Sequence, residues 1–179
     1  EAQSFNFKQG SFTSDAYLVE LPYENVNDKI IIKVEVKGKQ RRFLLDTGAP
    51  LAISQQLFEE LKPAVLTKQT IRDINQKKDS LLFIQMDSLK IGDVYATGIP
   101  AIVLKSNLIL ECLKLDGFLG SNVLQNSVIQ FDTQNQKIRI ANDTSNLNLK
   151  GIEAENLTLD SQGSPFLKFK IGKKISEYA

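Results

Sequence analysis

The chain has 179 residues, with 22 Lys and Arg against 21 Asp and Glu, and a formal net charge of +1. This balance argues against a dedicated nucleic-acid binder, and no apolar run is long enough to predict a transmembrane segment. The sequence has no histidine and one cysteine, which excludes Ser-His-Asp and Cys-His catalysis, His-ligated zinc and an intrachain disulfide. Chemistry here must use carboxylates, hydroxyls, amides or lysines, and we expect neither a metal nor a cofactor.

Apolar and polar residues alternate along much of the chain, which is typical of strands with one buried and one solvated face. Ile30, Ile32, Val34 and Val36 show this period most clearly, and a tight turn at 37–40 follows them. The strands predicted in this way span residues 30–36, 41–45, 81–91, 99–104, 128–131 and 137–141. Strands that recur at short intervals with turns between them predict an all-β barrel or sandwich.

Helical signals are few and short. A helix is predicted over residues 55–62, with Ser54 as its N-cap and Pro63 as its stop. A second short helix is predicted over residues 121–125, with Ser121 as its cap. The helices therefore add little to a fold that is built from strands.

The segment from Phe43 to Ala49 combines an apolar strand with a carboxylate, a hydroxyl and a glycine. Burial would raise the pKa of Asp46, because desolvation disfavours a charged carboxylate. Gly48 permits a sharp turn, and Thr47 can hold that turn by hydrogen bonds to the backbone. The tripeptide alone is equally compatible with an ordinary turn, because short motifs recur by chance.

Two motifs together make the chain resemble the pepsin-like and retropepsin-like aspartic protease superfamily, and most closely its bacterial retropepsin-like members. The first motif is Phe43-Leu44-Leu45-Asp46-Thr47-Gly48-Ala49, and the second is Asp116-Gly117-Phe118-Leu119-Gly120-Ser121-Asn122-Val123-Leu124. In this superfamily an apolar-apolar-glycine triplet lies beside the catalytic loop, and residues 118–120 fit that triplet. The resemblance covers about residues 25–141. It implies an all-β, acid-protease (retropepsin-like) β-barrel lobe with one or two short helices.

The resemblance implies an aspartic endopeptidase that acts on a polypeptide substrate. Two aspartates would share one proton and hold a water between them, because two carboxyls so close together cannot both ionise. The ionised carboxylate activates the water, and the neutral carboxyl donates to the peptide carbonyl. By resemblance the catalytic loop is Asp46, Thr47 and Gly48, the substrate-binding residues are Ala49, Asp73, Ile74 and Asn75, and the structural support is Phe118, Leu119 and Gly120.

The second catalytic aspartate is harder to place. Asp132 precedes a threonine but no glycine, so we interpret it as a hairpin-turn residue. Asp116 could cap a backbone loop or support the catalytic residues without contacting the substrate. One chain therefore supplies one clear aspartate, Asp46, and the other must come from a second lobe or from a homodimer mate.

A flap that covers the substrate is expected from the hairpin at about residues 66–83, with its tip at 73–79. This tip is polar and lacks the glycines of related flaps, and Pro50 stands where a small polar residue commonly follows the motif. These departures leave open a non-catalytic peptide-binding module, or a structural lobe of a larger secreted protein with the same fold.

The predicted organisation has four parts. Residues 1–24 form an N-terminal arm or edge strand, 25–143 the retropepsin-like lobe, and 144–164 a polar linker. Residues 165–179 form either a C-terminal hairpin or the start of a second repeat, because their pattern resembles that of Val34 onward. The repeat interpretation predicts a longer two-lobe protein that is cut before its second motif.

Two further expectations concern the compartment and the cysteine. The chain begins at Glu1 without a methionine or a leader, which favours either a processed extracytoplasmic (periplasmic or secreted) protein or a recombinant fragment. Cys112 lies in the apolar run 108–113, and no base stands out near it. We therefore expect Cys112 to be a buried small hydrophobic residue rather than a nucleophile.

Overall fold

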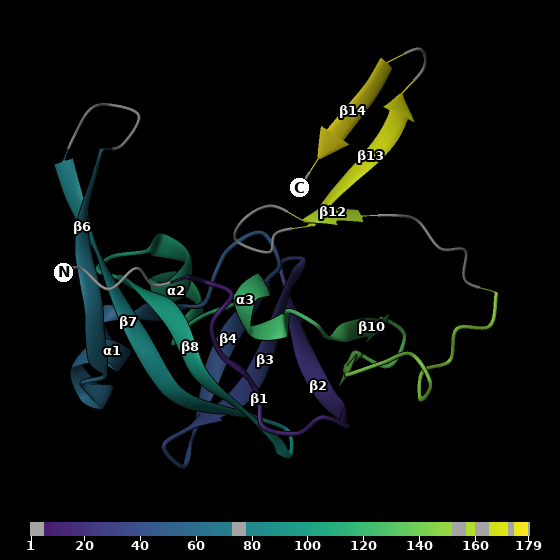
Figure 1. Cartoon of the computed structure of the whole chain (residues 1–179), viewed down its shortest axis with the longest axis horizontal. Coiled ribbons are helices and arrows are strands. Elements are labelled where there is room, and N and C mark those ends of the chain that lie inside the picture. Colours follow the sequence, from purple (N-terminus) through teal and green to yellow (C-terminus); the bar gives the residue numbers. More distant parts are fainter. Residues whose placement is uncertain (1–5, 73–77, 152–156, 160–164, 172–173, 179) are drawn as a thin grey trace.

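Six strands close into a barrel (Figure 1). The computed structural model describes residues 6–72, 78–151, 157–159, 165–171 and 174–178. Around the barrel the strands follow the order β3 (Lys29–Val36), β4 (Lys39–Asp46), β9 (Gly117–Gly120), β5 (Ala52–Ser54), β8 (Val94–Leu104) and β7 (Lys78–Ile91). One pairing between Glu35 and Lys90 joins β7 back to β3 and closes the ring.

Five further strands pair with strands of the barrel or with one another. Their bounds are β1 (Ser11–Phe12), β2 (Leu18–Val26), β6 (Ala64–Arg72), β10 (Val128–Asp132) and β11 (Lys137–Ala141). Strand β2 pairs with β3 and continues the sheet through β11 to β10, while β6 pairs with β7 and β1 pairs with β8. All six strands that the alternation predicted are present, and most of them are longer than predicted.

Three short helices accompany the strands: α1 (Gln55–Leu61), α2 (Leu108–Leu113) and α3 (Ser121–Leu124). Helix α1 confirms its prediction, because the Ser54 side chain accepts the Leu57 N–H and Lys62 ends the helix in a left-handed conformation with φ of 48°. None of the described helices has the length and apolarity to cross a membrane.

Helices α2 and α3 correct two details of the prediction. The run 108–113 is a helix capped by the Asn107 side chain, and Cys112 lies on its exposed side while Leu110 is buried. A helix hides only one of its faces, so an apolar run does not bury every member. The Ser121 side chain makes no capping hydrogen bond to α3, because Gly120 occupies the N-cap position.

The core fills the barrel from strands with alternating burial. Ile32, Val34 and Val36 of β3 point inward and are at most 2% exposed. Ile31 points the other way, yet it is also buried, because it joins a second cluster with Leu110 of α2. Helix α2 thus covers the outer face of the strand pair β3–β4. Each fully buried aliphatic side chain of this kind contributes about 1.5–3 kcal/mol.

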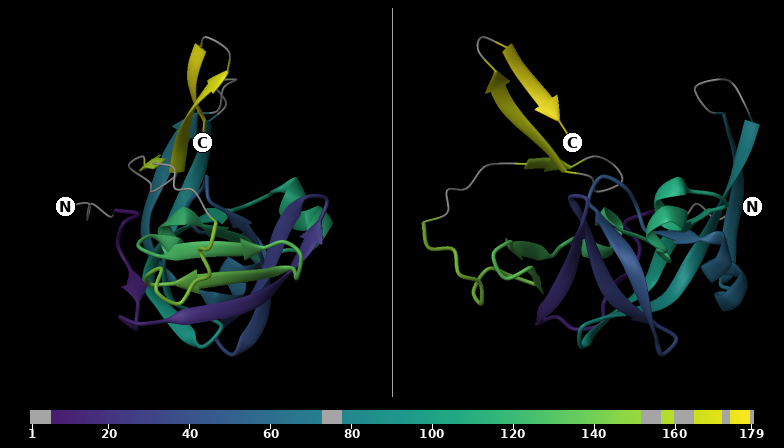
Figure 2. Two further views of the ribbon diagram at one scale, coloured as in Figure 1. Left: turned by 90° about the vertical axis from the view of Figure 1, so that its right-hand side faces the viewer. Right: turned by 180° about the vertical axis from the view of Figure 1, so that it is seen from behind.

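A small separate sheet forms from the C-terminal strands β12 (Leu157–Leu159), β13 (Pro165–Ile171) and β14 (Lys174–Tyr178). Figures 1 and 2 show these strands in yellow at the end of the chain. Strands β13 and β14 are an antiparallel pair. The predicted domain boundaries and the second repeat remain predictions.

Candidate active site

Asp46 is the last residue of β4 and lies beside the end of β9. The two strands are parallel, and their register pairs Phe43 with Gly117 and Asp46 with Gly120. Strand β4 therefore runs from the core, where Phe43 is 0% exposed, to the end of the barrel, where the Asp46 side chain is half-exposed. The structure thus brings the two sequence motifs together.

The loop after Asp46 turns sharply toward β5. The Gly48 N–H donates a hydrogen bond of 3.0 Å to Asp46 Oδ1, which fixes the carboxylate relative to the turn. Thr47 and Gly48 are exposed and Ala49 is half-buried. The Thr47 side chain makes no hydrogen bond within the described residues. Thr47 and Gly48 therefore form an exposed face of the loop.

Gly120 brings the loop into close contact with β9. A Cβ atom there would overlap the backbone of Ala49, Pro50 and Leu51, so only glycine fits. Gly117 is constrained in the same way by the backbone of Ala52. Close contact with the backbone thus explains why the predicted triplet ends in glycine. Positive φ is not the reason, because φ is not positive at Gly117 or Gly120.

Ser121 and Asn122 hold the loop, and sequence reasoning did not assign them this role. The Ser121 N–H donates to the Ala49 carbonyl at 2.8 Å. Asn122 Oδ1 accepts the Leu51 N–H at 2.6 Å, and Asn122 Nδ2 donates to the Pro100 carbonyl at 2.8 Å. Asn122 is 1% exposed. A polar residue in an apolar stretch is the signal that could have identified it, because buried amides need partners.

Asp116 has a structural position at the opposite end of the β4–β9 pair. Its Oδ2 accepts the Arg42 backbone N–H at 2.9 Å, and its Oδ1 lies 3.4 Å from Arg41 Nη1. Its backbone N–H donates to the Arg42 carbonyl, and its carbonyl accepts the Ser54 N–H. Asp116 therefore anchors β4 and the end of β5 to the start of β9.

Asp132 is a hairpin-turn residue, which confirms the interpretation of the sequence. It ends β10, and both the backbone and the side chain of Asn135 donate to its carboxylate. Hydrogen bonds from Asn135 lower the pKa of Asp132 below its ordinary value. Asp116 and Asp132 thus each bind partners in their own part of the fold, Arg42 and Asn135 respectively.

Strands β6 and β7 form the hairpin that the sequence predicted as a flap. They pair antiparallel as far as Arg72 and Lys78. The predicted substrate-binding residues Asp73, Ile74 and Asn75 lie outside the described residues. The hairpin rises at one side of the barrel in Figure 1.

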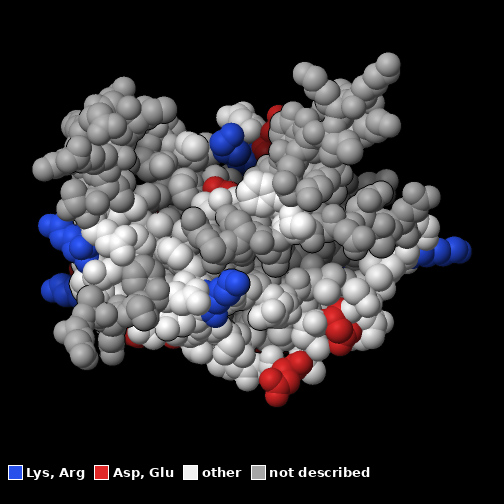
Figure 3. Space-filling model, turned by 45° about the horizontal axis from the view of Figure 1, so that its top comes forward, with Lys and Arg blue, Asp and Glu red and all other residues white. Residues whose placement is uncertain are grey.

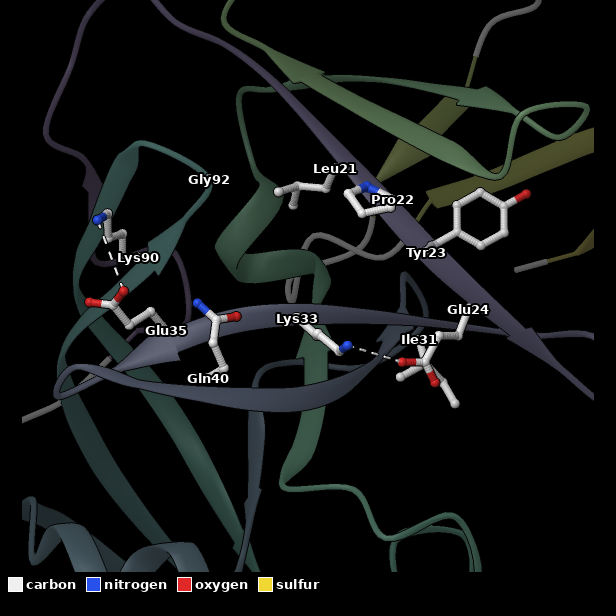
Figure 4. A pocket seen from close by; sticks show the side chains of 10 residues that line it. All are labelled: Leu21, Pro22, Tyr23, Glu24, Ile31, Lys33, Glu35, Gln40, Lys90 and Gly92. Carbon is white, nitrogen blue, oxygen red and sulfur yellow. Dashed lines mark ion pairs between the residues drawn. The ribbon is translucent and has the colours of Figure 1, made fainter.

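Two larger surface hollows lie away from Asp46. One of about 330 Å³ is lined by Leu21, Tyr23 and neighbours (Figure 4), with ion pairs Lys33–Glu24 and Lys90–Glu35 on two sides. The other, of about 680 Å³, lies between α1 and α2. Neither of these two hollows is lined by any residue of the loop 46–49.

The charged side chains on the face shown in Figure 3 do not form a patch of one sign that would indicate a charged ligand. In Figure 3 the described Lys, Arg, Asp and Glu side chains are scattered over the visible face. Within the described residues, no three acidic or cysteine side chains are grouped so that they could hold a metal ion. At Asp46 the described residues present a half-exposed carboxylate, a group that can take part in acid–base chemistry.

Comparison with known proteins agrees with this geometry. Residues 32–123 match a protein family described as aspartyl protease. Among solved structures, the chain is similar to a retropepsin-like aspartic protease from Rickettsia conorii, with 17% sequence identity and a TM-score of 0.50. The match covers 74% of this chain and 94% of that one, and it confirms the predicted retropepsin-like fold. A search of curated proteins gave no match.

Proposed function

Because the chain belongs to the aspartyl protease family, we propose that it is an endopeptidase in which Asp46 is one of two catalytic aspartates. The observation that carries this proposal is the pairing of Asp46 with Gly120 at the open end of a buried strand. No basic side chain of the described residues forms an ion pair with Asp46, so its carboxylate is available for acid–base chemistry.

The mechanism follows from two carboxyls that share a proton. At about 3 Å apart they cannot both be charged, so one remains protonated. The ionised carboxylate removes a proton from a water molecule, which attacks the peptide carbonyl carbon. The protonated carboxyl donates to the carbonyl oxygen, and the proton taken from the water later goes to the leaving nitrogen. A chain without histidine can carry out this reaction.

The second aspartate comes from a second copy of the chain or from a second lobe. The exposed Thr47 and Gly48 support this, because they leave the loop open toward a partner. The engagement of Asp116 with Arg42 and of Asp132 with Asn135 supports it as well. In a symmetric pair, the free Thr47 hydroxyl would hydrogen-bond across the axis to its equivalent.

Cleavage of an unstructured protein at several pH values tests the proposal. We expect cleavage by the wild type, its loss in Asp46→Asn, and inhibition by a statine-type mimic of the tetrahedral intermediate. Asp93→Asn is a matched control, because Asp93 lies in the β7–β8 turn. Peptide or inhibitor binding without cleavage would instead support the non-catalytic module, and neither activity would support a structural lobe.

Mixing wild type with Asp46→Asn identifies the source of the second aspartate. If each copy supplies one Asp46, mixed dimers are inactive, and an equimolar mixture retains about a quarter of the activity of undiluted wild type. If one longer chain supplies both aspartates, the mixture retains about half. The experiment requires time for the copies to exchange, and gel filtration of the mixture checks the assembly.

A further inference from the structure

Asn122 stands out as a buried polar side chain whose amide oxygen and nitrogen each make a hydrogen bond. Only Ser121 and Asn122 are buried polar residues among the described part of the chain. Asn122 binds two backbone groups that belong to different segments, the Leu51 N–H at 2.6 Å and the Pro100 carbonyl at 2.8 Å. Its amide thus links the start of α3, the segment that leaves the Asp46 loop, and strand β8.

The segment that leaves the loop depends on these links. The Ala49 carbonyl accepts from the Ser121 N–H, Pro50 has no N–H to donate, and the Leu51 carbonyl accepts from the Ile102 N–H. The Leu51 N–H is consequently the only backbone donor between Ala49 and Ala52, and Asn122 is its partner. Two proteins that differ only at Asn122 would differ in how firmly this segment is held.

The segment that enters the loop is held differently. Strand β4 reaches Asp46 through the parallel ladder with β9, which ends at Gly120. Asn122 follows two residues later, after Gly120 and Ser121. The entering and leaving segments of the loop are therefore both fixed to the same short stretch, residues 117–122.

We propose that Asn122 is a positioning residue that sets the orientation of the Asp46 carboxylate through Leu51 and the loop between them. The proposal rests on the proposed protease function and adds a residue that determines its rate. Asn122 does not act on the substrate. It determines how accurately Asp46 faces its partner, and a displacement of about 1 Å at such a site can lower the rate by about 10²-fold.

Asn122→Asp tests this through a pH-dependent rescue. A protonated Asp presents a carbonyl oxygen to the Leu51 N–H and a hydroxyl to the Pro100 carbonyl, as the amide does. An ionised Asp has no donor for Pro100, and burial beside that carbonyl raises the pKa of the new carboxyl. We expect kcat about 10–100-fold below wild type at pH 7 and within about threefold of wild type near pH 4.

Two further variants separate positioning from general destabilisation. Asn122→Leu has neither donor nor acceptor, so we expect a lowered kcat at every pH and no recovery in acid. Ile140→Ala removes buried side-chain volume on β11, away from the loop, and its kcat relative to wild type is expected to stay near one at all pH values. We expect KM to change less than about twofold in the folded variants.

Each outcome decides the proposal. Folded Asn122→Leu with wild-type kcat would overturn it, and so would equal losses in Asn122→Leu and Ile140→Ala. If the wild type cleaves nothing, the proposed function fails, and amide hydrogen exchange then tests positioning alone. Faster exchange at Gly48 and Leu51 in Asn122→Leu than in Ile140→Ala supports the proposal, and equal exchange in the two variants overturns it.

Discussion

Two aspartates lie at opposite ends of one strand pair, β4 with β9, and have opposite surroundings. Asp116, at the beginning of β9, has both carboxylate oxygens near donors from Arg41 and Arg42. Asp46, at the end of β4, accepts the Gly48 N–H and forms no ion pair within the described residues. The same residue type is therefore a structural anchor at one end, and at the other end it is the residue that we propose as a catalytic acid or base.

The difference shows that partners, rather than the carboxylate itself, decide the role. The carboxylate oxygens of Asp116 bind a guanidinium and a backbone N–H of the same chain, so they are engaged in holding the strand pair. Asp46 is positioned by the Gly48 N–H and by the pairing of β4 with β9, and it forms no ion pair within the described residues.

Gly120→Ala should disturb the Asp46 end of the β4–β9 pair, and it has the largest expected effect on stability. The added methyl group overlaps the backbone of Ala49, Pro50 and Leu51, which cannot move aside as a flexible side chain can. We expect a loss of about 3 kcal/mol in the free energy of unfolding, measured by urea titration.

Gly38→Ala is the control for that substitution. Gly38 lies in the β3–β4 turn with φ of +75° and no atom within 4 Å of the added methyl group. Backbone strain alone should cost about 1 kcal/mol there. Equal losses in the two variants would mean that close contact at Gly120 does not constrain the loop.

Asp116→Ala should disturb the opposite end of the β4–β9 pair, where Asp116 binds Arg42. The Arg42 N–H loses its acceptor, and among the described residues Arg41 keeps its ion pair with Glu60 alone. We expect the free energy of unfolding to fall by about 1–3 kcal/mol, which is the usual cost of an unsatisfied buried donor. An unchanged urea midpoint would contradict the anchoring role of Asp116. Asp93→Ala, in the exposed β7–β8 turn, is the surface control.

Glu60 shares Arg41 with Asp116, and the contribution of Glu60 to stability should depend on pH. Arg41, and then Lys39, lower the pKa of Glu60 from 4.5 to about 2. A lowered folded-state pKa means that the stabilising contribution of Glu60 is complete above pH 4.5 and is lost as the pH falls toward 2. We expect wild type to exceed Glu60→Gln in stability at pH 6, and the difference to shrink between pH 4.5 and 2. A difference that is constant over this range would exclude the ion pair as its cause.

Much of the barrel could be predicted because its strands follow a simple period. Ile32, Val34 and Val36 alternate with polar residues, and the structure buries all three. The proximity of Asp46 to residues 118–120 was predicted only from a family resemblance, since parallel pairing between distant segments leaves no local signal.

Other features depend on contacts that are distant in the sequence. Whether Asp116 binds Arg42 cannot be derived from either residue alone, because the register of β4 against β9 brings them together. Helix α2 was missed because its apolar residues resemble a strand, and its cap, Asn107, is a common turn residue. The role of Asn122 appears only when Leu51 and Pro100 are placed beside it.

Steady-state cleavage kinetics of Asp46→Asn and Asp116→Asn on one unstructured substrate test the central claim most directly. The account predicts that Asp46→Asn lowers kcat/KM by about 10³-fold or more with an unchanged melting temperature. It predicts that Asp116→Asn lowers the melting temperature, while kcat/KM per folded molecule stays within about threefold of wild type. Wild-type kcat/KM in Asp46→Asn, or its loss in folded Asp116→Asn, would contradict the account.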